Sequence, residues 1–121
     1  MDMQLKQYER LRRRKVDNKG EETLRHMQSR FVRLIGLLII FADDQGYELT
    51  FGDAFATSGH MKDSLHYSRL AIDLNLFKGG VYLTETMDYK TLGTYWESIG
   101  GSWGGRFGDG NHYSLEYKGR R

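Results

Sequence analysis

Two histidines and two aspartates have the residue types and the spacing for metal chemistry. Asp73 follows His66 by seven residues, and Asp109 precedes His112 by three, across a glycine. Two neutral imidazoles and one carboxylate are an ordinary protein ligand set for a catalytic zinc, and a second carboxylate can take a proton from water. Histidines and aspartates scattered over a surface would give the same spacing. Spacing alone therefore leaves both interpretations open.

Two predicted strands have to position these side chains. Leu70–Phe77 alternates apolar residues with a second set that includes Asp73, which is typical of a strand with one buried face. A Lys-Gly-Gly turn predicts a hairpin from this strand into Val81–Leu83. After a glycine-rich loop, Asn111–Tyr117 alternates again and is expected to carry His112 as a last strand.

Helical patterns dominate the first part of the chain. Apolar residues three and four positions apart predict a short helix over Met3–Asp17 and a long, largely buried one over Glu21–Gln45. A strand is expected at Tyr47–Phe51, a polar connection at Gly52–Asp63, and an amphipathic helix at Leu92–Ile99. Helices followed by a mostly antiparallel sheet with one inserted helix make the fold class α+β.

Length and composition narrow the possible chemistry. A chain of 121 residues fits one domain, and the absence of cysteine excludes disulfides, a thiol nucleophile and thiolate zinc sites. Charge is uneven: residues 4–19 hold seven basic and two acidic side chains, whereas residues 43–118 hold six basic and eleven acidic ones. We therefore expect a basic helical arm over residues 1–20 and a single domain over residues 21–121.

Two segments resemble the motifs of a known family. Ser64–Asp73, with the sequence SLHYSRLAID, resembles the S-x-H-x-x-G-x-A-x-D motif of the M15 zinc peptidases. Trp103-Gly104-Gly105 followed by Asp109-Gly110-Asn111-His112 resembles the second motif, D/E-x-x-H, in the matching order and separation. The resemblance runs from about Tyr47 to Tyr117, and it implies the M15, hedgehog-like peptidase fold with a zinc ion.

The resemblance also implies a role for individual residues. His66, Asp73 and His112 would be the zinc ligands, Asp109 would be the general base and acid, and Ser64 would be a supporting polar residue. Trp103 would be either a wall of the site or part of the core, and we favour the core.

Two positions depart from the family pattern. The motif glycine is Arg69 here, and the stretch Phe51–Ala56 ends in alanine where the family usually continues with an arginine that helps to hold substrate. Either Arg69 or Arg106 would then replace the missing cation.

The expected activity is zinc-dependent cleavage of the stem peptide of bacterial peptidoglycan, between L-alanine and D-glutamate, in the manner of a phage endolysin. The alternatives are a D-alanyl-D-alanine carboxypeptidase and a metal-binding but inactive module for binding or assembly. We expect a monomer with no specific nucleic-acid partner. The basic arm is either a solvated helix face, an electrostatic contact with anionic cell surfaces, or a contact with nucleic acid or protein.

The longest apolar run, Leu34–Ala42, has nine residues, whereas a bilayer span needs about 20. No secretory signal precedes it. The expected course is synthesis in the host cytoplasm, release by another agent, and action on the cell wall.

Overall fold

Helix α2 (Leu24–Asp44) is the longest element of the computed structural model, which describes residues 23–56, 58–59 and 64–121. The hydroxyl of Thr23 caps its first turn by accepting a hydrogen bond from the His26 amide at 3.1 Å. The helix ends before Gly46, whose φ of +86° favours glycine. The buried side of α2 is apolar and comprises Phe31, Leu34, Ile35, Leu37, Leu38 and Ala42. The helix expected over Met3–Asp17, together with Glu21 and Glu22, lies outside the described residues.

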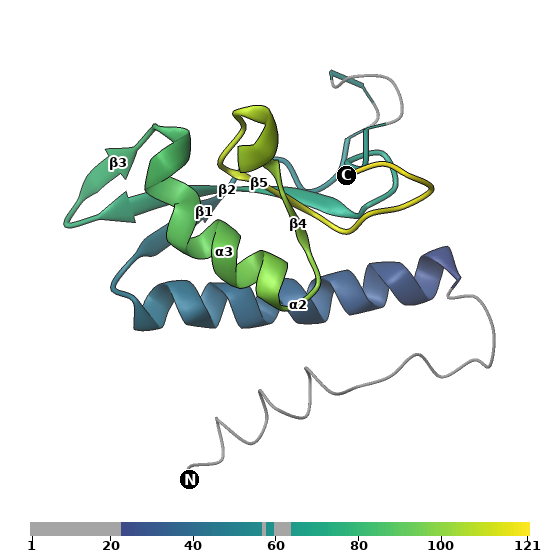
Figure 1. Cartoon of the computed structure of the whole chain (residues 1–121), viewed down its shortest axis with the longest axis horizontal. Helices are drawn as coiled ribbons and strands as arrows, with labels where there is room; N and C mark the ends of the chain where they lie inside the picture. Colours follow the sequence, from purple (N-terminus) through teal and green to yellow (C-terminus); the bar gives the residue numbers. More distant parts are fainter. Residues whose placement is uncertain (1–22, 57, 60–63) are drawn as a thin grey trace, which may run out of the picture.

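An antiparallel sheet packs beside this helix (Figure 1). Its strands are β1 (Glu48–Phe51), β2 (Ala71–Lys78), β3 (Val81–Leu83), β4 (Ser102–Trp103) and β5 (His112–Ser114). The strand order is β1-β2-β5-β4, and β3 also pairs with β2 through the expected Gly79-Gly80 turn. The helices and the antiparallel sheet confirm the α+β prediction.

The structure confirms the predicted last strand but shortens it, and it corrects the expectation of a loop before that strand. The strand predicted over Asn111–Tyr117 is only three residues long, although Leu74 and Leu115 still donate backbone hydrogen bonds across the β2–β5 pair. The predicted glycine-rich loop contains strand β4 and a 3-10 helix, η2 (Gly104–Phe107). A two-residue strand has no periodicity that a sequence pattern can show.

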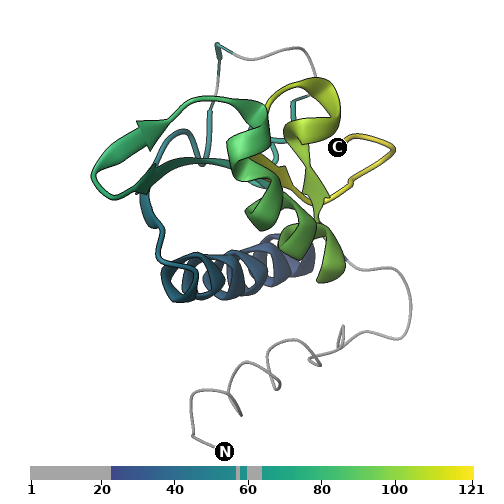
Figure 2. The same cartoon turned by 60° about the vertical axis from the view of Figure 1, so that its left-hand side comes forward.

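Helix α3 (Lys90–Ser98) follows a 3-10 turn, η1 (Thr86–Tyr89), and lies beside α2 under the sheet (Figure 2). Its Trp96 is fully buried and makes edge-to-face contacts with Phe31 and Tyr113, with ring centroids 5.9 and 6.1 Å apart. The indole N–H donates to the Ser114 and Ser102 carbonyls at 3.0 and 3.1 Å. Trp96 therefore joins both helices to the β4–β5 edge and fixes the strand that carries His112.

Strand β2 alternates as the sequence predicts. Ile72, Leu74 and Leu76 are buried, whereas Asp73 and Asn75 between them are half-buried. The polar face of the strand is thus available for a site. Across the described ranges, no helix combines the length and the apolar content needed to cross a membrane.

Candidate metal centre

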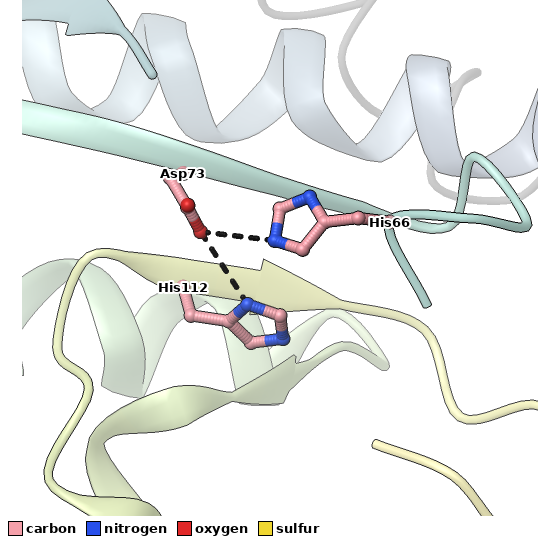
Figure 3. A group of neighbouring side chains, drawn as sticks. All are labelled: His66, Asp73 and His112. Carbon is pink, nitrogen blue, oxygen red and sulfur yellow. Dashed lines mark ion pairs between the residues drawn. The ribbon is translucent and has the colours of Figure 1, made fainter. Parts of the chain in front are cut away.

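Three of the predicted site residues converge on one point (Figure 3). Asp73 on β2 and His112 on β5 are direct partners in the antiparallel register, so their side chains leave the sheet on the same face. His66 reaches the same point from the turn before β2. The Asp73 Oδ1 atom lies 3.3 Å from His66 Nε2 and 3.4 Å from His112 Nδ1.

The turn from Ser64 to Leu70 holds His66 in place. The Ser64 hydroxyl accepts a hydrogen bond from the His66 amide at 3.2 Å, and Leu70 donates to the Leu65 carbonyl at 3.0 Å. The Gln28 side chain on α2 donates to the Ser68 carbonyl at 2.9 Å, which ties the turn to the long helix. His66 is only 2% exposed, although the polar residues beside it in the sequence predict an exposed position.

A neighbouring segment fixes the backbone of Asp73 on its other side. Gly52 donates to the Asp73 carbonyl at 2.7 Å, and the Asp73 amide donates to the Asp53 carbonyl at 2.8 Å. A Cβ atom at Gly52 would lie 3.0 Å from the Cβ of Asp73, so the close approach favours glycine there.

The charge state of Asp73 suits a metal ligand. Burial disfavours its ionised form, but hydrogen bonds and charge from His112 and His66 outweigh burial and lower the pKa of Asp73 from 3.8 to about 2. The carboxyl group is therefore ionised at neutral pH and needs no deprotonation before it binds a cation.

Gly104 allows the close packing around His112. A Cβ atom at this position would lie 2.4 Å from the Asp109 carbonyl oxygen and 2.6 Å from the Cβ of His112. The Asp109 amide donates to the Gly104 carbonyl at 3.0 Å, and the His112 amide donates to the Asp109 carbonyl at 3.2 Å. Backbone hydrogen bonds within the second motif therefore link Gly104, Asp109 and His112, and they fix the backbone from which the His112 side chain projects.

The donor set fits zinc. One ligand atom from each of His66, Asp73 and His112 lies within 4.8 Å of the other two. Ligand atoms about 2.0–2.2 Å from zinc at tetrahedral angles are roughly 3.3–3.5 Å apart, which matches the two measured separations. Within residues 23–56, 58–59 and 64–121, no second group of three such side chains is present.

Comparison with known families agrees with this geometry. Residues 57–115 match the M15 peptidase model that is described as D-alanyl-D-alanine carboxypeptidase. This part of the chain belongs to the M15 peptidase family. The match confirms the resemblance that the two motifs predicted, and the matched segment contains all three residues of the candidate metal centre. A search of curated proteins found no match to the chain.

Asp109, the predicted base of the M15 domain, lies next to the centre but not in it. It is exposed and does not belong to the group of atoms that lie within 4.8 Å of one another. It lines a polar cavity of about 150 Å³ together with Tyr82, Thr84, Thr86, Tyr89 and Asn111. Thr86 holds the loop that carries Asp109, because its hydroxyl donates a hydrogen bond to the Gly108 carbonyl at 2.9 Å. Sequence reasoning missed Thr86 because the contact joins residues 22 positions apart.

The other predicted site residues of the M15 domain have separate environments. Arg106 forms a two-pronged pair with Glu97, with N–O distances of 2.9 and 3.2 Å. Trp103 packs against the core, and its indole donates to the Gly110 carbonyl at 2.7 Å. Arg69 is exposed, and its guanidinium carbon lies 4.2 Å from the ring centroid of Phe55. The structure thus brings Arg69 to the His66 turn and ties Arg106 to helix α3.

Proposed function

We propose that this M15 domain is a zinc-dependent peptidase that cleaves peptidoglycan between L-alanine and D-glutamate of the stem peptide, as phage endolysins do. The observation that carries the proposal is the convergence of His66, Asp73 and His112 inside the segment that matches the family. These three residues would hold the ion. When bound, zinc supplies Lewis-acid chemistry that polarises a carbonyl and acidifies water.

The residues of the chain account for the rest of the reaction. Histidine binds metal through a neutral imidazole, so His66 and His112 would each offer a ring nitrogen, and Asp73 would offer its ionised oxygen. Asp109, on the loop that its own backbone ties to His112, is proposed to accept a proton from the attacking water and return it to the leaving amine. Asp109 is exposed, so its carboxylate is accessible from the solvent.

One rival function has an observation in its favour. The matching family model is described as a D-alanyl-D-alanine carboxypeptidase, so removal of a terminal D-alanine is the second candidate. Both activities use the same metal and the same base. They differ only in which peptide bond is placed against the centre.

The experiment is digestion of purified peptidoglycan by the zinc-loaded chain, followed by mass spectrometry of the products. A new amino terminus on D-glutamate supports the endopeptidase, and free D-alanine supports the carboxypeptidase. Intact muropeptides after digestion with a folded, zinc-loaded chain would contradict both and favour a binding or assembly module. The Asp109→Asn variant is the matched control, because it changes one oxygen to a nitrogen and leaves the three ligands in place.

The partner and the place of action are part of the proposal. Peptidoglycan would be the macromolecular substrate, and the chain would reach it from the host cytoplasm after another agent releases it. The basic residues between Gln4 and Lys19 would add a salt-sensitive attraction to anionic cell surfaces.

A further inference from the structure

Arg69 has a backbone conformation that is unfavourable for its residue type. Its φ is +59°, and among the described residues only Arg69 and Lys118 combine a positive φ with a side chain. A Cβ atom disfavours the left-handed region, and residues held there are concentrated at functional sites. The strained backbone therefore marks Arg69 as a candidate functional residue.

The backbone of Arg69 is attached to the metal centre. The carbonyl oxygen of His66 accepts hydrogen bonds from the amides of Arg69 at 3.3 Å and Ala56 at 3.4 Å. The segment that ends at Ala56 is bonded at its other end to Asp73, through Gly52 and Asp53. The segment from Gly52 to Ala56 therefore forms an edge of the site between Asp73 and His66. Arg69 lies at the His66 end of this edge.

The side chain of Arg69 stacks on an aromatic ring and has no ion pair among the residues that the structure describes. Its guanidinium group lies over the half-exposed ring of Phe55, on the same edge segment, at 4.2 Å. No carboxylate in the described part of the chain pairs with it, whereas Arg106 is fully engaged by Glu97. A guanidinium on a ring face keeps its N–H donors at the edges, where they can bind a carboxylate in two-pronged geometry.

We propose that Arg69, held on the ring of Phe55, binds the free carboxylate of the substrate residue that supplies the leaving amine. The proposal rests on the proposed function and names the substrate feature that is selected. Terminal D-alanine carries such a carboxylate. Glutamate has two carboxyl groups and uses one in the peptide chain, so it also keeps one free. Arg69 thus selects peptides with a negative charge next to the scissile bond, whichever of the two bonds is cleaved.

The test compares two stem peptides that differ only in this group, one with the carboxylate and one with the uncharged carboxamide. Binding is measured by calorimetry on the zinc-free full chain, which does not turn the peptides over, and kcat/KM is measured after zinc is added. The wild-type chain is expected to prefer the carboxylate peptide by roughly tenfold or more, the range for a charged hydrogen bond. Arg69→Gln should lose that preference by weakening only the carboxylate peptide. A variant that keeps the preference, or a wild-type chain that has none, would overturn the proposal.

Two further variants separate binding from folding. Arg69→Gly removes the unfavourable backbone conformation, so the variant should melt no lower than the wild type and still lose the preference. A purely structural role predicts lower melting and equal losses for both peptides. Lys78→Gln is the matched control, because Lys78 also lies over an aromatic ring, that of Tyr47 at 4.8 Å, but at the far end of β2. It should keep the wild-type preference.

The outcomes also distinguish this proposal from the function on which it rests. If the zinc-loaded chain cleaves neither peptide while the zinc-free chain prefers the carboxylate through Arg69, the proposed activity fails and the binding role of Arg69 stands. If both peptides are cleaved with equal kcat/KM and bound equally, the activity stands and the role of Arg69 is refuted.

Discussion

Gly104→Ala is expected to damage the metal centre without changing any proposed ligand. The new methyl group would lie 2.4 Å from the Asp109 carbonyl oxygen, 2.6 Å from the Cβ of His112 and 3.2 Å from its ring carbon Cδ2. The first two contacts are too short for real Cβ atoms, and both partners are part of the hydrogen-bonded second motif, so the loop has to move. Overpacking of this kind costs about 1–3 kcal/mol of unfolding free energy.

The same displacement should weaken metal binding. A shift of His112 away from Asp73 lengthens the 3.4 Å separation between His112 Nδ1 and Asp73 Oδ1, which fits zinc. Changes around metal ligands commonly lower metal affinity about 10- to 100-fold. The assays are urea denaturation of the zinc-free chain and competition for zinc with a chromophoric chelator. Gly36→Ala is the matched control, because a methyl group there meets nothing within 4 Å in a helix, where alanine is favoured by up to about 1 kcal/mol.

The two measurements together test whether close packing at Gly104 positions His112. We expect the Gly104→Ala variant to lose both stability and zinc affinity, and the Gly36→Ala variant to lose neither. Wild-type zinc affinity in a Gly104→Ala chain would show that the close packing at this glycine does not set the position of His112.

Three further predictions concern the ligands, the base and the arm. His112→Ala should lower zinc content, whereas Asp109→Ala should keep zinc and lose most turnover; near-normal turnover of the Asp109 variant would refute the base assignment. In the zinc-free chain, the low pKa of Asp73 adds stability that is complete above about pH 4 and is lost as the pH falls toward 2, so Asp73→Asn should flatten melting temperature against pH in that range. Deleting Met1–Lys19 should leave hydrolysis of a small muropeptide unchanged and slow lysis of permeabilised cells at low salt; equal lysis rates at every salt concentration, with a stable fold, would remove the proposed role of the arm.

The parts of the fold that follow from periodicity were predictable. The alternation along β2 placed Asp73 on the face opposite Leu74, and the helical spacing around Trp96 predicted α3. Both patterns are local, because burial of one face selects the residue types of one strand or helix. The metal ligands were named from motifs, and the structure supplies the reason they meet: Asp73 and His112 are register partners.

The parts that depend on distant contacts were not predictable. From the sequence, the glycines near Trp103 indicate only a loop. In the structure, Cβ atoms at Gly93 and Gly105 would lie 2.1 and 2.3 Å from the Trp103 ring. These glycines make room for an indole that fixes β4. Likewise, the sequence left Arg69 and Arg106 as equal candidates to replace the missing arginine of the family. It does not show that Glu97 pairs with Arg106 and not with Arg69.

X-ray absorption spectroscopy of the zinc-loaded full chain, with metal content measured on the same sample, shows whether His66, Asp73 and His112 bind zinc. We expect one zinc per chain with two imidazole nitrogens at about 2.0–2.1 Å and carboxylate oxygen at about 2.0–2.2 Å. That signal should be lost in the His66→Ala, Asp73→Ala and His112→Ala variants. A chain that holds no zinc after zinc is added back, or that holds it unchanged in the three variants, would contradict the metal centre proposed for this M15 domain.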